Sequence, residues 1–204
     1  FLKIKTEDPG TYLVGLSTKA RNLAMSALEF NNYLKHDGVL DMLEQRESQG
    51  LLNEDAIERY SKHVKTIFQV GDSLTDDYKT VLGYPIEFVP YQNPYDIHVG
   101  HELEVQLLYQ GKPLADQLVY VGHAPTSMTH THDGSTHSHE TGTDHQHTDL
   151  DTLRTDENGM VKIKITSEGK WYLRTIHLIN STEEMLTHES NWATLTFAIG
   201  QGHS

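Results

Sequence analysis

Residues 102–113, with the sequence ELEVQLLYQGKP, decide the fold class of this 204-residue chain. Apolar side chains at 103, 105, 107 and 109 alternate with mostly polar ones, which is the pattern of a strand with one buried face. The Gly-Lys-Pro turn at 111–113 then leads into a second strand-like run at 117–121. This stretch therefore predicts β-strands joined by a tight turn.

The same pattern extends from Gly83 to the C-terminus. Further strands are predicted at 86–89, 161–165, 171–179 and 192–199. The turn sequence Asp156-Glu157-Asn158-Gly159 introduces the second of these, and we expect a hairpin through Gly169 to connect the second with the third. Strands at such short intervals predict a Greek-key β-sandwich domain of immunoglobulin-like size over residues 83–204.

Residues 1–82 have a mixed α+β pattern. Turn residues at 8–10 predict a β-hairpin between strands at 1–5 and 12–17. Apolar residues three and four positions apart predict a helix at 22–38, and a second, shorter helix is predicted at 39–49, where Gly50 ends it. In the next stretch a helix is predicted to begin after Asn53. Alternating residues from 64 to 70 leave open that this helix gives way to a strand around Ser61. The fold class is therefore predicted as mainly β with an α+β N-terminal region.

Histidines are concentrated in one segment of the predicted sandwich. Seven of the 14 lie between 123 and 147, and six of them form three His-x-His pairs: His130 with His132, His137 with His139, and His145 with His147. Three carboxylates lie among them, and residues 113–153 contain no Lys or Arg that would compete with a dication. Imidazole and carboxylate groups bind Zn, Ni and Co. Residues 123–150 are therefore predicted to form a metal-binding insertion.

The backbone conformation decides what a His-x-His pair does. In a strand both imidazoles point to the same face and converge on one ion, whereas in a flexible loop they raise the local ligand concentration. Gly134, Gly142 and several Ser and Thr residues predict the looser arrangement here. His123 ends the strand that enters the insertion, so we expect it at the base of the site.

Composition excludes several classes of protein. A formal net charge of -13, with only 16 scattered Lys and Arg residues, argues against nucleic-acid binding. No apolar run reaches the length of a membrane-spanning helix. The chain has no His-Glu-x-x-His helix motif, nucleophile elbow or phosphate-binding glycine loop, so we do not expect an enzyme. Without cysteine, only His, Asp and Glu remain as strong metal ligands.

Several short motifs occur in a fixed order along nearly the whole chain. They are Pro9-Gly10-Thr11-Tyr12, Phe30-Asn31-Asn32-Tyr33-Leu34, Glu58-Arg59-Tyr60-Ser61-Lys62, Gly111-Lys112-Pro113-Leu114, Thr155-Asp156-Glu157-Asn158-Gly159, Gly169-Lys170-Trp171-Tyr172 with His177, and Glu189-Ser190 with Trp192. This ordered set resembles the DUF4198 family of bacterial periplasmic proteins, which is related to the NikM-like periplasmic component of nickel and cobalt uptake systems. The resemblance implies an extracytoplasmic protein whose signal peptide has been removed.

The resemblance also adds candidate ligands outside the insertion. His177 and Glu189 fall in two of the family's characteristic motifs, and with His188 they would form a second ligand cluster if their strands were neighbours. From its residues alone, His177 also fits a half-buried, hydrogen-bonded histidine of the sandwich.

We therefore expect an extracytoplasmic protein that captures or buffers Zn, Ni or Co through its His-rich loop. A membrane metal-uptake system would then be its partner. The alternative is an adhesion or carbohydrate-binding module in which the histidines are incidental. In that case sugars would stack on tyrosines such as Tyr91, Tyr95, Tyr109 and Tyr120.

Overall fold

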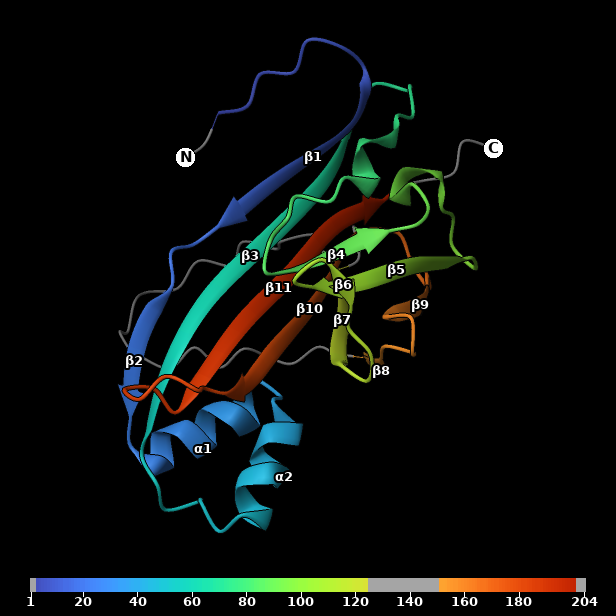
Figure 1. Cartoon of the computed structure of the whole chain (residues 1–204). Helices are drawn as coiled ribbons and strands as arrows, with labels where there is room; N and C mark the ends of the chain where they lie inside the picture. The colour runs from blue at the N-terminus through green and yellow to red at the C-terminus, as the bar shows by residue number, and fades with distance from the viewer. Residues whose placement is uncertain (1–2, 125–150, 201–204) are drawn as a thin grey trace, which may run out of the picture.

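The computed structural model of the chain describes residues 3–124 and 151–200, and in these ranges two β-sheets pack together (Figure 1). The large sheet has seven strands: β1 (Gly10–Ser17), β2 (Arg21–Met25), β3 (Ala56–Val70), β7 (Leu118–Ala124), β8 (Asp151–Arg154), β10 (Gly169–Asn180) and β11 (His188–Ile199). The small sheet has four: β4 (Ile86–Pro90), β5 (Glu102–Tyr109), β6 (Lys112–Pro113) and β9 (Met160–Lys164).

The large sheet joins residues from both ends of the chain. Its order is β1-β3-β11-β10-β7-β8, and β2 also pairs with β3. β3 runs parallel to β11, whereas the other pairs in this sheet are antiparallel. Strands that precede and follow Gly83 therefore share one sheet.

Two helices cover one end of the large sheet. α1 (Ala27–His36) begins at a capping box, in which Ser26 accepts from the backbone N–H of Glu29 and the Glu29 carboxylate accepts from the N–H of Ser26. α2 (Leu40–Ser48) follows after a short turn. Two short 3-10 helices, η1 (Asp76–Lys79) and η2 (Pro94–Asp96), lie beside the small sheet.

The central strands of the large sheet change their buried face part-way along. In β3 the buried positions are even at Ala56 and Glu58 but odd from Ser61 to Ile67. β10 and β11 show the same change of parity. Because successive side chains of a strand point to opposite faces, two separate cores result.

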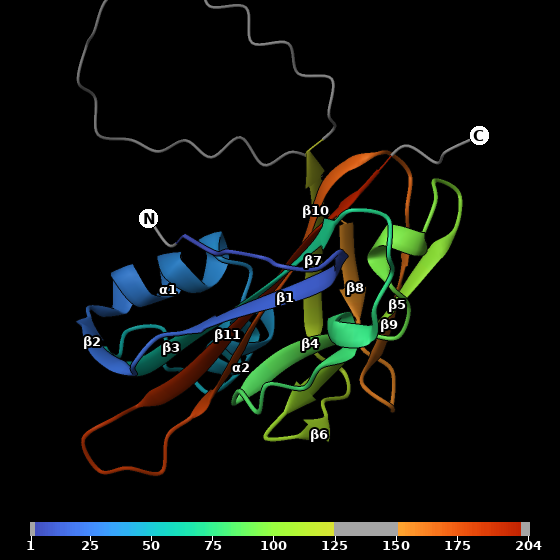
Figure 2. The same cartoon turned by 90° about the horizontal axis from the view of Figure 1, so that it is seen from above.

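The two cores lie on opposite faces of the large sheet. One contains side chains of α1 and α2 packed on Ala56, Ile176 and Leu178. The other contains side chains of the small sheet packed on residues such as Leu173 and Leu195. Figures 1 and 2 show the helices at one end of the long strands and the small sheet at the other. The predicted β-sandwich with an α+β N-terminal region is confirmed.

Three sequence-based expectations in the N-terminal region were wrong. Residues 3–8 form no strand, and β1 pairs with β3 along its whole length, so the hairpin about residues 8–10 is absent from the described residues. Residues 21–25 form β2 rather than the first turns of a helix, because they pair with β3 and α1 starts only at its capping box. The helix after Asn53 is instead β3, which starts before Ser61 because strands on both sides supply its backbone hydrogen bonds.

The expected hairpin through Gly169 is also wrong. β9 pairs with β5 in the small sheet, whereas β10 pairs with β7 and β11 in the large sheet. The chain therefore crosses from one sheet to the other at this point. Turn chemistry was visible in the sequence, but it does not specify whether the next strand pairs with the previous one.

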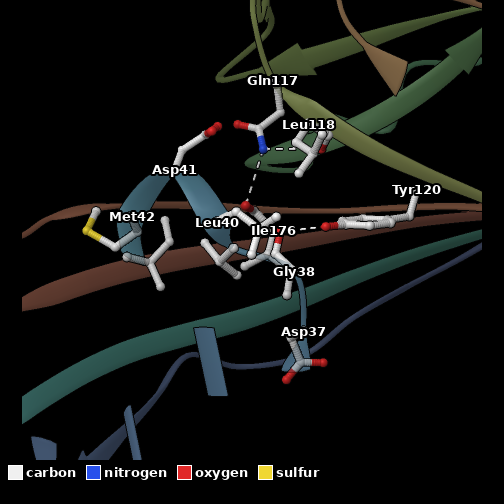
Figure 3. Close-up of a pocket in the computed structure, with 11 residues that line it drawn as sticks. Asp37, Gly38, Leu40, Asp41, Met42, Gln117, Leu118, Tyr120 and Ile176 are labelled. Atoms are coloured by element: carbon white, nitrogen blue, oxygen red, sulfur yellow. Dashed lines mark hydrogen bonds between the residues drawn. The ribbon is translucent and has the colours of Figure 1, made fainter. Parts of the chain in front are cut away.

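The turn between α1 and α2 rests on β7 through Gly38. Gly38 has a φ of 76°, and its carbonyl oxygen accepts a hydrogen bond of 2.9 Å from the Tyr120 hydroxyl (Figure 3). A Cβ atom added to Gly38 would lie 2.0 Å from that hydroxyl oxygen. Gly50, which follows α2, has a similar φ of 72° but no heavy atom within 4 Å of such a Cβ.

These two glycines provide a matched test of the packing between the helices and the sheet. We expect Gly50→Ala to lower the free energy of unfolding by about 1 kcal/mol through backbone strain alone. Gly38→Ala carries the same strain and must also displace Tyr120, so its loss should exceed that of Gly50→Ala by about 1–3 kcal/mol. Urea unfolding measures both, and equal losses would contradict the close contact.

Candidate metal centre

The predicted metal-binding insertion lies between β7 and β8. These strands pair antiparallel, with Leu118 opposite Arg154 and Val121 opposite Asp151. Both ends of the insertion therefore leave the large sheet at the same end of this strand pair. The six paired histidines, His130, His132, His137, His139, His145 and His147, lie outside the described residues.

His123 lies on β7 close to where the insertion begins. It is opposite Trp171 of β10, and the two rings stack with centroids 4.7 Å apart and planes inclined by 20°. The indole Nε1 donates a hydrogen bond of 3.0 Å to the carbonyl oxygen of Ser167, which fixes the ring beneath His123. The His123 imidazole is half-buried and held at the end of β7.

His177 is oriented by Gln117. The Gln117 amide nitrogen donates to Thr175 Oγ1 at 3.0 Å. It also donates to the carbonyl oxygens of Ile176 and Leu118 at 3.3 and 3.4 Å (Figure 3). Because these contacts fix the amide, its Oε1 must accept from His177 Nδ1, at 2.8 Å. The lone pair of His177 is therefore on Nε2.

His177 has the protonation state that a metal ligand requires. Burial lowers the pKa of its imidazole below the usual 6.5, so the ring is neutral at pH 7. A ligand histidine commonly donates its other ring N–H to an oxygen, as His177 does to Gln117. The Tyr109 ring packs against the same imidazole at 4.5 Å between centroids.

His188 and Glu189 face opposite sides of the large sheet. The His188 ring packs on Phe30 at 4.6 Å between centroids, within the helix-covered core. Burial, with a smaller contribution from the charge of Arg46, lowers the pKa of His188 to about 4. On the other face, Glu189 accepts a hydrogen bond of 2.9 Å from the Ser181 hydroxyl. Adjacent residues of one strand cannot converge on one ion.

The structure places His123 far from His177 and Glu189. His123 is opposite Trp171 of β10. His177 lies near the other end of β10, where it is opposite Asn191, and Glu189 is opposite Ile179. At about 3.3 Å per residue, His123 and His177 are about 20 Å apart along the strands. In residues 3–124 and 151–200, no group of three His, Asp or Glu side chains is placed to hold a metal ion.

Most of the tyrosines considered as sugar-stacking residues have structural partners. Tyr95 donates a hydrogen bond of 3.2 Å to the carbonyl oxygen of Ile67, and Tyr120 donates to that of Gly38. Tyr109 packs on His177, and only Tyr91 of the four is more than half exposed, at 55%.

Sequence reasoning did not single out Gln117, which gives His177 its orientation. No local signal marks Gln117, because it lies 60 positions from His177 in the sequence. The two side chains meet only when β7 and β10 pair.

The comparisons with known proteins give one match. The family model described as "Domain of unknown function (DUF4198)" matches residues 1–179. No curated protein and no solved structure matches the chain. Among the helices of the described residues, none is long and apolar enough to cross a membrane.

Proposed function

The chain belongs to the DUF4198 family, and from that premise we propose that it is an extracytoplasmic protein that binds transition metals. It captures or buffers Zn, Ni or Co through residues 123–147 and passes the ion to a membrane metal-uptake system. This role corresponds to that of the NikM-like periplasmic components of nickel and cobalt uptake. The protein acts by binding and not by catalysis.

The observation that carries this proposal is the composition of residues 113–153. Half of the histidines of the chain lie there, three His-x-His pairs among them, together with Asp133, Glu140 and Asp144 and without any Lys or Arg. Neutral imidazoles beside carboxylates bind borderline divalent cations. The chain as a whole is acidic, with a formal net charge of -13, which also favours cations.

The frame of the insertion supports the same function. β7 and β8 pair with each other and therefore hold the two ends of the insertion side by side. His123 is held on Trp171 at the end of β7, next to the first residues of the insertion. His177 is competent as a ligand by its tautomer, but its distance from His123 makes it a candidate for a separate, weaker site.

Calorimetric titration of the full chain with Ni²⁺, Zn²⁺ and Co²⁺ tests this function. We expect a dissociation constant of about 10 μM or tighter at neutral pH. Replacing the six paired histidines of residues 130–147 by asparagine should weaken binding by about 100-fold or more. The matched control replaces exposed histidines elsewhere, His36, His98 and His101, by asparagine and should bind as the unmodified chain does.

The pH dependence of the same titration has a defined sign. An imidazole must be neutral to bind a metal, so affinity should fall as pH decreases through about 6.5.

Binding no tighter than about 1 mM at neutral pH would disprove the proposal. Equal binding by the chain that lacks the six histidines would disprove the assignment of the site.

A further inference from the structure

A pocket of about 290 Å³ lies on the helix-covered face of the large sheet. Tyr33 and Asp37, from α1 and the residue that caps it, form one wall. Glu58, Tyr60 and Lys62 of β3 and Trp192 of β11 contribute the floor, together with two apolar side chains of β2. The lining is thus aromatic and apolar, with the two carboxyl groups of Asp37 and Glu58 and the ammonium group of Lys62.

The Glu58 carboxyl group is buried without a full set of partners. Its side chain is 2% exposed, and its Oε1 accepts hydrogen bonds from the Tyr33 hydroxyl at 3.2 Å and from the Ser190 hydroxyl. Among the residues that the structure describes, its Oε2 accepts no hydrogen bond and has no ion-pair partner, and it is not a fully buried unpaired atom, so it is left free for the pocket that Glu58 lines. Burial raises the pKa of Glu58 and outweighs the hydrogen bonds from Ser190 and Tyr33 and the charge of Lys62, which lower it.

Glu87 shows how this fold compensates a carboxylate that is buried to the same degree. It is also 2% exposed, but it accepts from Lys65 Nζ at 2.8 Å and from the backbone N–H groups of Leu82, Gly83 and Tyr84. A buried carboxylate generally needs such a cation and such donors. Glu58 has the two hydroxyl donors but no ion-pair partner among the described residues, and the pocket that it lines can admit a cation.

The aromatic rings of the pocket already accommodate a cation. The exposed Lys62 places its ammonium 4.1 Å from the centre of the Trp192 ring and 6.0 Å from that of Tyr60. Trp192 is held by a hydrogen bond of 3.2 Å from Nε1 to Ser190 Oγ, and its ring is parallel to that of Tyr33 within 8°. Aromatic faces carry negative potential that attracts cations.

We propose that this pocket binds a small organic ammonium ion, a primary amine with an apolar body. Its ammonium group donates a hydrogen bond to Glu58 Oε2, and its hydrocarbon part packs on the aromatic and apolar lining. The carboxyl groups of Asp37 and Glu58 disfavour anions, and a neutral ligand would leave Glu58 without a counter-charge. The site is independent of the metal-binding function.

Lys62 gives the proposal a second consequence. Its ammonium lies over the same ring system and repels an incoming cation, so it limits affinity. Replacing Lys62 with glutamine should therefore strengthen the binding of an amine, whereas the binding of a neutral sugar or alcohol, which the ammonium does not repel, should stay about the same.

The test titrates the full chain at about pH 7 with benzylamine, which is protonated, and with benzyl alcohol, which has the same shape and no charge. Benzylamine should bind about tenfold more tightly than benzyl alcohol. Glu58→Gln should weaken benzylamine binding about tenfold or more, because its amide keeps the contacts of Oε1 but turns a donor towards the pocket. Lys62→Gln should tighten it several-fold, and the exposed Glu102→Gln serves as the control that changes nothing.

Three results would overturn the proposal. They are equal affinities for the amine and the alcohol, unchanged amine binding by a folded Glu58→Gln chain, and binding of methyl glucoside in preference to the amine. Circular dichroism establishes that each variant is folded. If Glu58→Gln does not fold, the Lys62→Gln chain tests the proposal instead. Weaker or unchanged amine binding by that variant would contradict the binding of a positively charged ligand in the pocket.

Discussion

Replacing Lys65 by methionine is expected to lower the free energy of unfolding by about 3–5 kcal/mol, because it leaves Glu87 as an unpaired buried charge. Lys65 is 1% exposed and its Nζ donates to Glu87 Oε2 and to the carbonyl oxygen of Thr80, each at 2.8 Å. Burial lowers the pKa of Lys65, and the contact with Glu87 opposes that shift. The pair thus lies between the two sheets and remains charged only because each partner is present.

Two further variants distinguish the stability lost with the charge partner from the stability lost with side-chain packing. Lys65→Met combined with Glu87→Gln removes both charges and keeps an oxygen for the backbone donors, so its loss should be smaller than that of the single variant. Lys162→Met removes the exposed partner of Glu104 and should cost at most about 1 kcal/mol. Urea unfolding measures all three. A double variant as unstable as Lys65→Met would show that packing, and not charge, is responsible.

The second large effect is a loss of stability in acid that depends on His188. The folded state holds the pKa of His188 at about 4, whereas the unfolded chain has a value near 6.5. Below pH 6.5 the unfolded state therefore binds a proton that the folded state does not. The contribution of His188 is complete above about pH 6.5 and is lost as pH falls to about 4, with a size of about 2–3 kcal/mol.

Replacement of His188 by asparagine should reduce this pH dependence. The variant is expected to show a smaller decrease in unfolding free energy between pH 6.5 and 4.5 than the unmodified chain. Some dependence remains, because burial also lowers the pKa values of His63 and His177. His36→Asn, at an exposed position on α1, is the control and should follow the unmodified chain. An unchanged slope in the His188 variant would contradict the burial of a neutral imidazole.

The sequence predicted the elements whose signals are local. The alternation at 103–109 identifies β5, the stop at Gly50 marks the end of α2, and turn residues mark the start of β9. It failed where long-range pairing overrode local pattern. Residues 56–60 have helical apolar spacing, yet they form β3 because β2 and β11 pair with it on either side. The local sequence around Glu58 does not indicate that this residue pairs with His188, 130 positions away.

The candidate sites divide in the same way. The His-x-His pairs are visible in the sequence because they are neighbours along the chain. The partnership of Gln117 with His177 and the convergence of Tyr33, Glu58 and Trp192 are not, since each requires distant strands to come together. The change of buried face along β3 is also unforeseen, because it depends on helices at one end and a second sheet at the other.

The central claim is that the histidines between β7 and β8 hold a transition metal. Anomalous diffraction from crystals of the full chain grown with stoichiometric Ni²⁺ tests it most directly, since the anomalous peak identifies both the element and its ligands. We predict a peak bonded to imidazole nitrogens from residues 130–147, with His123 as an additional ligand at its base. A nickel site formed only by residues outside 123–147, or no site at all, would contradict the claim.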